Sequence, residues 1–345
     1  MENNDDTTAV GTDRRDGIVA RVGNGFAEWL VTFVRTNMGI LLALVLMVLF
    51  LCIFTTTFPR EKNIINVLRQ ISTNTCLALG VMLAIIISGI DLTSGAIVAL
   101  SGSLATKLMV DFGLPIWQAF LIGCLIGAVA GMANGLIIAY TGMPPFVVTL
   151  AMMNICRGAA YLTANGKPIR VPNSVFGDSF EIIGTGYFHK IPYPVIYTVI
   201  FLIITHFVLS QTRLGRHIYA VGGNREAARF SGISPSRIEI IVYTYSGFLA
   251  AFAGVVLAAR MASGQPAVGI GYETDAIAAA VLGGASMAGG VGTVGGLILG
   301  ALVIGILSNG LNLLGVNSFW QYVAKGVVIL LAVYMDIYRK RRERF

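Results

Sequence analysis

Charge is scarce in this chain of 345 residues: only 12% of its side chains are charged, whereas 56% are hydrophobic. An ordinary water-soluble domain carries roughly 25% charged residues. A soluble fold cannot bury so large a share of apolar surface. The scarcity of charge therefore excludes a water-soluble protein and indicates a protein embedded in a membrane.

Cysteine and histidine are also rare, with four and three copies. The cysteines lie in hydrophobic runs without CxxC spacing, so we interpret them as small buried side chains rather than disulfides or metal ligands. The sequence contains no GxxxxGK[ST] phosphate loop, no HExxH motif and no recognisable Ser/His/Asp set. We therefore expect no catalytic residue, no metal site and no cofactor in this chain.

Long stretches without charge mark the membrane-spanning segments. No Asp, Glu, Lys or Arg lies between Arg69 and Asp91 or between Glu239 and Arg260, and each gap approaches the roughly 20 residues that a spanning helix needs. The pattern predicts an all-α, polytopic membrane protein with about ten transmembrane helices. We place them at about 38–58, 70–90, 93–110, 115–140, 146–164, 192–210, 239–260, 273–289, 292–314 and 319–337.

Basic residues fix the expected orientation. Of the 24 Lys and Arg residues, many gather in the N-terminal tail, in the 211–238 loop and near the C-terminus, and cytoplasmic segments carry such an excess. We therefore expect a cytoplasmic tail at 1–36, a transmembrane domain at 37–338 and a basic cytoplasmic tail at 339–345. The 211–238 loop would be cytoplasmic and the 165–191 loop would lie outside. The net charge of +7 is explained by these segments, so we expect no nucleic-acid partner.

The N-terminal tail carries a further pattern. About 36 mostly polar residues precede the first apolar run, so we expect that run to be an uncleaved anchor and not a signal peptide. Apolar residues at helical spacing predict an amphipathic helix lying in the membrane interface: Ile18, Val22, Phe26, Trp29 and Phe33.

A weak internal repeat relates two of the expected spans. The segment 131–136 (GMANGL), followed by Gly142 and Phe146, resembles 305–311 (GILSNGL), followed by Gly315 and Phe319. The two spans would cross in opposite directions, and inverted repeats of this kind are typical of transporters. The candidate residues of a translocation path are Asp91, Asn134, Phe146, Asn309 and Phe319.

Structural roles remain open for each of these residues. The two asparagines could make hydrogen bonds between helices, and the two phenylalanines could serve in packing or as gates. Asp91 lies in a glycine-rich break at 88–95, where it could cap the helix that follows. A second glycine-rich break at 283–292 suggests either irregular backbone at membrane depth or close helix packing.

Four ionisable residues lie within or beside the expected spans: Arg157, Glu273, Asp275 and Lys325. A charge that faces lipid at the centre of the bilayer costs at least about 2.5–3.5 kcal/mol, so these side chains must face protein or water. We consider two roles, an intramembrane ion pair among the four and a hydrophilic lining of an outer cavity.

The cytoplasmic loop has the most specific pattern. Five arginines lie between positions 213 and 237, and Gly222-Gly223-Asn224 leads into Glu226-Ala227-Ala228. We expect a short helix there, ended by Gly232 and Pro235. A plain basic loop is the alternative, but a turn that leads into a helix favours an element that docks a cytoplasmic partner.

At these residues the chain resembles the membrane permeases of bacterial ABC importers for monosaccharides, over about 38–337. The resemblance is strongest at 88–92 (SGIDL), 212–216 (TRLGR), 220–228 (AVGGNREAA), 271–278 (GYETDAIA) and 309–316 (NGLNLLGV). The last motif, together with 262–266 (ASGQP), is most similar to the ribose members of that family.

The resemblance implies a permease subunit in the bacterial inner membrane that forms the path for a monosaccharide, ribose first. It implies a second permease copy, ATPase subunits that bind ATP and Mg in the cytoplasm, and a periplasmic sugar-binding protein. The loop would be the ATPase-coupling element, through Arg216, Gly222, Gly223, Asn224, Glu226, Ala227, Ala228 and Gly232. The alternatives are an importer for a branched-chain amino acid or a nucleoside, an ion-coupled transporter and a membrane-embedded enzyme.

Overall fold

The computed structural model of the chain describes residue 34 and residues 37–172 and 178–343. The predicted amphipathic helix of the tail lies outside these residues. The strands of the described part form two small antiparallel pairs, β1 (Ile169–Arg170) with β4 (Ser263–Gly264) and β2 (Tyr187–Phe188) with β3 (Ile191–Pro192). Nearly everything else is helix, which confirms the predicted all-α class.

Eight helices of the described part are long and apolar enough to cross a membrane. They are Asn37–Phe54, α2 (Glu61–Ile86), α3 (Ser94–Phe112), α4 (Ile116–Thr141), α5 (Pro145–Thr163), α7 (Tyr193–Gln211), α10 (Pro235–Arg260) and α12 (Val294–Leu313). A further long helix, α13 (Ser318–Glu343), has a shorter apolar part, Ser318–Leu331. The short helices are α6 (Asp178–Thr185), α8 (Arg213–Gly223), α9 (Arg225–Phe230) and α11 (Tyr272–Leu282).

The eighth predicted span, 273–289, is not a complete transmembrane helix. Its helix, α11, has 11 residues and ends at Leu282, where a glycine-rich turn replaces it. A helix of this length covers only about 16 Å, well short of the hydrocarbon core. Both roles considered for the glycine-rich break at 283–292 are present, because the backbone is irregular there and a Cβ on Gly283 would lie 2.5 Å from the carbonyl oxygen of Gly296.

The second predicted span began too late. We placed its start at residue 70 because charged residues precede it, but α2 begins at Glu61 and includes Arg69. Acidic residues are favourable in the first turn of a helix, and Glu61 occupies that position. Charge near the end of a span does not stop a helix, so the charge-free gap underestimated its length.

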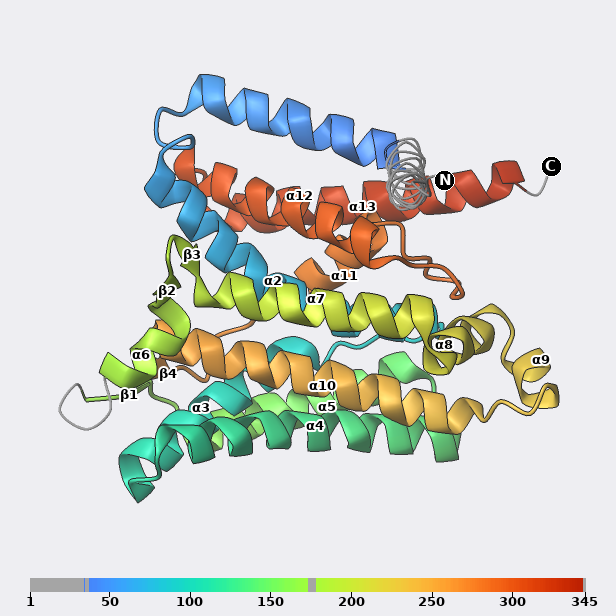
Figure 1. The fold of residues 1–345 in the computed structure, drawn as a ribbon, viewed down its shortest axis with the longest axis horizontal. Helices are drawn as coiled ribbons and strands as arrows, with labels where there is room; N and C mark the ends of the chain where they lie inside the picture. Colours follow the sequence, from blue (N-terminus) through green and yellow to red (C-terminus); the bar gives the residue numbers. More distant parts are fainter. Residues whose placement is uncertain (1–33, 35–36, 173–177, 344–345) are drawn as a thin grey trace, which may run out of the picture.

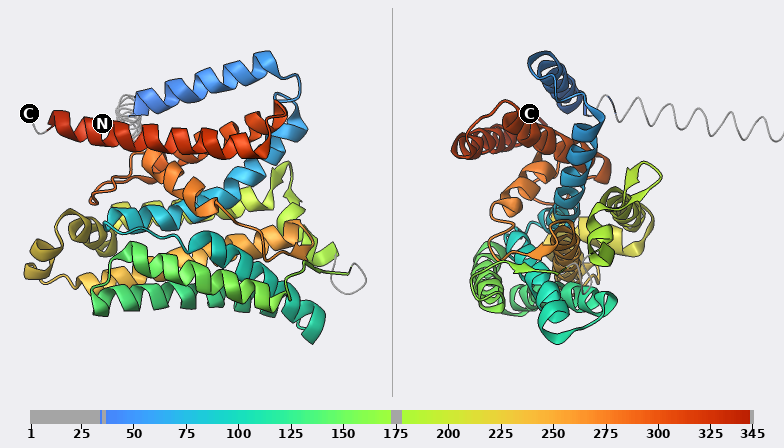
Figure 2. Two further views of the ribbon diagram at one scale, coloured as in Figure 1. Left: turned by 180° about the vertical axis from the view of Figure 1, so that it is seen from behind. Right: turned by 90° about the vertical axis from the view of Figure 1, so that its left-hand side faces the viewer.

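The long helices lie side by side along one direction of the molecule (Figure 1). Helices α8 and α9 project from one end, which we call the α8 end, and α6 lies with the four strands at the other, which we call the β end. The helix Asn37–Phe54 starts on the side of the α8 end, and α13 ends on the same side. The view from behind shows the same arrangement (Figure 2). An even number of crossings predicts this arrangement of the two ends.

The chain has two halves, one that ends with α5 and one that begins with α7. The second long helix of each half packs on the other half. Helix α2 packs on α11 and α12, while α10 packs on α3 and α4. Helix α4 ends near the α8 end, where Ala139 accepts a hydrogen bond from Ser236, whereas α12 begins there, just after Gly292. The two repeat segments thus cross in opposite directions, as the inverted repeat predicts.

Small residues let α4 and α10 approach closely. A Cβ atom on Gly131 would lie 2.1 Å from the carbonyl oxygen of Tyr243, and one on Gly127 would lie 2.3 Å from the Cβ of Ala251. These glycines are one helical turn apart on one face of α4. The backbone of α10 occupies the space that larger side chains would need.

We expect Gly131→Val to reduce the free energy of unfolding by about 1–3 kcal/mol, because the added side chain forces α4 away from α10. The measurement is the thermal unfolding of the purified protein in detergent. Gly158→Val is the matched control, since a Cβ on Gly158 has nothing within 4 Å. Equal unfolding midpoints for the two variants would contradict the role of this contact.

Candidate functional site

Helices α8 and α9 form the connection between α7 and α10, and the sequence sets their starts. The hydroxyl of Thr212 accepts a hydrogen bond from the backbone N–H of Gly215 at 3.2 Å, and the side-chain oxygen of Asn224 accepts one from Ala227 at 2.9 Å. Both are N-cap contacts, which satisfy amide groups that the helix leaves unpaired. Asn224 therefore begins the predicted short helix.

The predicted end of that helix is also confirmed. Helix α9 closes with the N–H of Ile233 on the carbonyl of Ala228, and Gly232 between them has a φ of +81°. Glycine adopts this left-handed conformation without the strain that a side chain would bring. The segment before Asn224 differs from the expectation, because α8 is itself a helix and not a loop.

The outward face of α9 is exposed and unlike an ordinary connector. Glu226, Ala227 and Arg229 are exposed, and Phe230 is 90% exposed. Ala228 is buried and holds the helix against the rest of the chain. An exposed aromatic side chain among charged residues at the tip of a protruding helix is typical of a surface that binds a partner.

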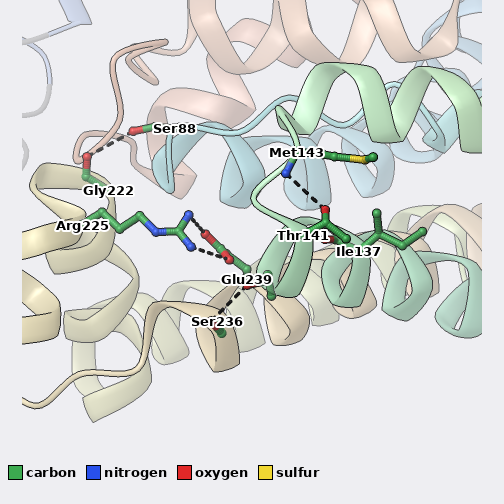
Figure 3. A network of polar contacts seen from close by, with 9 residues as sticks. Ser88, Ile137, Thr141, Met143, Gly222, Arg225, Ser236 and Glu239 are labelled. Carbon is green, nitrogen blue, oxygen red and sulfur yellow. Dashed lines mark hydrogen bonds and ion pairs between the residues drawn. The ribbon is translucent and has the colours of Figure 1, made fainter.

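A buried carboxylate ties α9 to α10. Arg225 forms an ion pair with Glu239, and its second guanidinium nitrogen donates to the other carboxylate oxygen at 3.3 Å (Figure 3). The Glu239 side chain is 5% exposed, whereas that of Arg225 is 53% exposed. The sequence prediction missed Glu239, although an acidic residue at the start of a long apolar run was the available signal.

Three segments meet at the C-terminal part of α8, and we call this contact the junction. They are residues 86–88, residues 219–222 of α8 itself and residues 288–292. Ser88 Oγ lies 3.2 Å from the carbonyl oxygen of Gly222 (Figure 3). It also lies 3.1 Å from the carbonyl oxygen of Ala288. The N–H of Gly290 donates to the carbonyl of Ile86 at 2.8 Å. The α2–α3 turn and the α11–α12 turn are thereby both attached to α8.

The Tyr219 hydroxyl supplies another bond of the junction, donating to the carbonyl of Gly292 at 2.7 Å. Burial raises the pKa of this hydroxyl above its ordinary value, so it remains a protonated donor at neutral pH. The sequence prediction also missed Tyr219. Its position, one helical turn before Gly222, was the only signal available.

Gly222 is the tightest point of the junction. A Cβ atom at this position would lie 1.7 Å from the carbonyl oxygen of Ile86 and 2.7 Å from the backbone nitrogen of Gly290. Neighbouring Gly223 has nothing within 4 Å of its Cβ position. The two predicted glycines therefore have different roles, and only the first is required by a close backbone approach.

Two of the predicted path residues meet in a buried polar cluster. The Asp91 carboxylate accepts hydrogen bonds from the N–H of Thr93 at 2.9 Å and from the hydroxyl of Ser246 at 2.6 Å. Asn134 donates to the Thr93 hydroxyl at 2.7 Å. Asp91 does not cap α3, because it accepts from the N–H of Thr93, the residue before the helix, and the start of α3 has no side-chain cap. Asn134 makes a hydrogen bond between helices.

The other three path candidates lie apart from this cluster. Asn309 and Asn63 exchange two hydrogen bonds between their amides, at 3.0 and 3.1 Å, near the β end. Phe146, at the start of α5, is 50% exposed, and Phe319, at the start of α13, is 77% exposed. The structure does not bring the five residues together into one site.

One ion pair forms among the four predicted ionisable residues. Lys325 Nζ lies 2.7 Å from a carboxylate oxygen of Asp275, which connects α13 to α11. Arg157 instead donates to the carbonyl oxygens of Pro266 and Val268 at 3.0 and 2.6 Å. The Lys325–Asp275 contact is the intramembrane ion pair that we considered. Arg157 is not part of it and binds the segment before α11 instead.

The β end contains a cavity of about 550 Å³ where β1 pairs with β4. Ser263 is buried there, and the structure shows no hydrogen-bond partner for its hydroxyl among the described residues. The cavity is lined by Pro168, Arg170, Val171, Met261, Ala262, Ser263 and Gln265.

Comparison with known proteins agrees with this architecture. The family model described as "Branched-chain amino acid transport system / permease component" matches residues 63–333. The ribose import permease protein of Bacillus subtilis is 45% identical over 303 residues, which cover 88% of this chain and 93% of the relative. The ribose import permease protein of Haemophilus influenzae is 41% identical over 297 residues, covering 86% and 92%.

A relative named for another sugar is also similar. The D-allose transport system permease protein of Escherichia coli is 39% identical over 281 residues, which cover 81% of this chain and 84% of that protein. No solved structure gives a significant match.

We expect Gly222→Ala to destabilise the α8 end by about 1–3 kcal/mol, because the new methyl group would overlap the Ile86 carbonyl. Thermal unfolding of the purified protein measures the loss. Gly223→Ala adds the same methyl group one residue later in open space and should change stability by less than about 0.5 kcal/mol. The junction is wrongly described if both variants unfold at the wild-type temperature.

Proposed function

The chain belongs to the branched-chain amino acid transport system / permease component family, and from this premise we propose that it is the permease subunit of an ATP-binding-cassette importer for a monosaccharide, ribose first. The observation that carries the proposal is the high identity to ribose import permeases along most of the chain. The sequence motifs of the coupling loop support the same assignment.

We infer the class of solute from the names of the individual relatives and not from the family description. The proteins with the highest identities are named for ribose and allose, and others for xylose and L-arabinose. All of these solutes are neutral sugars with five or six carbons. A branched-chain amino acid, which the family description names, is the alternative that an uptake assay must exclude.

The exposed face of α9 supports a cytoplasmic ATPase as the partner at the α8 end. This face presents Glu226, Arg229 and Phe230 beyond the helix bundle. We assign ATP and its magnesium ion to the ATPase subunits and the β end to a periplasmic sugar-binding protein. A second copy of the chain would complete the path, in the bacterial inner membrane with both termini in the cytoplasm.

The junction provides a mechanical route from the ATPase to the path. When the ATPase subunits close, α9 is displaced, and the Arg225–Glu239 pair transmits that displacement to α10. Helix α8 moves with α9, and its bonds at Gly222 and Tyr219 transmit the movement to the α2–α3 and α11–α12 turns. The path would change from outward-facing to inward-facing without covalent chemistry on the sugar.

The candidate coupling residues divide by role in this mechanism. Glu226 and Arg216 are exposed and would contact the ATPase, as would Ala227 on the outer face of α9. Asn224, Ala228 and Gly232 shape and anchor α9. Gly222 joins the junction, and Gly223 leaves the exposed side of α8 open.

We expect Glu226→Lys to remove an ATP-binding-cassette subunit from the complex that copurifies with this chain in mild detergent, because the reversed charge faces the partner. Glu61→Lys makes the same change at an exposed position at the β end and should retain the ATPase. Retention of the ATPase by the Glu226 variant, at wild-type expression, would refute the docking role of α9.

Uptake of labelled solutes tests the substrate. Cells that lack their own ribose uptake and express this chain with its partner subunits should accumulate ribose, and uptake should continue when the proton gradient is collapsed with ATP maintained. Exclusive uptake of a nucleoside or a branched-chain amino acid would remove the sugar assignment. Loss of uptake with the proton gradient would favour an ion-coupled transporter.

A further inference from the structure

Two arginines from different helices meet at the β end. Arg69 lies in the first third of α2, and Arg260 is the last residue of α10. Consecutive residues of α6 contact both: the carbonyl oxygen of Thr185 accepts a hydrogen bond from Arg69, and a Cβ on Gly184 would lie 2.3 Å from the backbone nitrogen of Arg260. Both arginines therefore lie beside the end of α6.

Neutral groups hold both guanidinium groups in place. Arg260 donates to the side-chain oxygen of Asn66 at 2.6 Å, and Asn66 lies one helical turn before Arg69 on the same face of α2. The guanidinium carbon of Arg69 lies 4.6 Å from the centre of the Tyr187 ring. The groups that orient the two arginines, the Asn66 amide, the Thr185 carbonyl and the Tyr187 ring, are all uncharged.

Most of the hydrogen-bond donors of this pair have no protein partner within the described part of the chain. A guanidinium group has five N–H donors, and the structure shows one hydrogen bond from each of the two arginines. Arg69 Nε is buried and has no hydrogen-bond partner among the described residues. Among the described residues, the acceptors bound by the two guanidinium groups are the Thr185 carbonyl and the Asn66 side-chain oxygen, so the site has more donors than acceptors.

Counter-charge is missing as well. The ion pairs of the described residues are Arg225–Glu239 and Lys325–Asp275, so neither Arg69 nor Arg260 has a carboxylate partner there. Arg260 binds Asn66, which lies one helical turn before Arg69, so the two positive charges lie near each other. Two like charges in a partly buried position gain most from an anion that bridges them, and the planar guanidinium fork fits a carboxylate with two parallel hydrogen bonds.

We propose that Arg69 and Arg260 form a carboxylate-binding site at the β end. The carboxylate comes from one of two sources, an acidic side chain of the protein that delivers the solute or the acid group of a sugar acid. The proposal rests on the proposed function only for the direction from which the ligand arrives. The site itself depends on the two arginines and their missing counter-charge.

The test uses the full chain purified in lipid nanodiscs, with sodium acetate replacing sodium chloride at constant ionic strength. Acetate should raise the thermal unfolding midpoint of the wild-type protein by about 2 °C or more, because a ligand that binds only the folded state stabilises it. Arg69→Gln and Arg260→Gln should each lose most of this increase. Lys62→Gln removes one charge from an exposed position on the same helix and should keep it.

A second variant separates charge from geometry. Arg69→Lys retains the positive charge but lacks the fork, so it should retain less than half of the acetate effect. If Arg69→Gln does not fold, the Arg69→Lys and Arg260→Gln variants together still test the proposal. An acetate effect that is absent from the wild-type protein, or unchanged in both glutamine variants, would overturn the proposal.

Glucuronate distinguishes the two sources. If the natural ligand is a sugar acid, glucuronate should produce the same shift at a concentration about tenfold lower than acetate, because its hydroxyl groups add contacts. If the ligand is an acidic side chain of the delivery protein, glucuronate and acetate should act at similar concentrations. Because no transport is measured, the outcome is independent of whether the chain carries ribose.

Discussion

The approach of the Gly222 backbone to the carbonyl oxygen of Ile86 is the contact on which the arrangement of the α8 end depends. It brings α8 within hydrogen-bonding distance of both glycine-rich turns, through Ser88 and Tyr219. Irregular backbone within a membrane protein must satisfy its polar groups inside the protein. The three segments do this for one another at the carbonyl groups of Ile86, Gly222 and Gly292, each of which accepts a hydrogen bond within the junction.

The inverted arrangement of the two halves explains why one loop can act on both. Each half places its second long helix against the third and fourth helices of the other, as α2 does with α11 and α12. The turns that follow α2 and α11 consequently lie beside each other at the α8 end, where Gly290 bonds to Ile86. A displacement of α8 reaches the two halves together, although α8 belongs to the connection between them.

Features encoded locally could be predicted from the sequence. Charge-free gaps predicted the membrane-spanning class and most of the helices, and Asn224 and Gly232 predicted where α9 begins and ends. The Glu239 partner of Arg225, the Tyr219 bond to Gly292 and the Asn63 partner of Asn309 were not predictable, because each depends on residues brought together by the tertiary fold. The prediction of a full span at 273–289 failed for a related reason. The segment has the apolar composition of a span, but α11 ends at Leu282, next to the close backbone packing around Gly283.

The reciprocal amide pair of Asn63 and Asn309 fastens the start of α2 to the last part of α12. At the opposite end, the Gly290–Ile86 hydrogen bond fastens the end of α2 to the segment that leads into α12. Two helices attached near both ends should resist sliding and tilting against each other. We therefore expect them to move as one unit, with the rearrangement that opens the path taking place beside them.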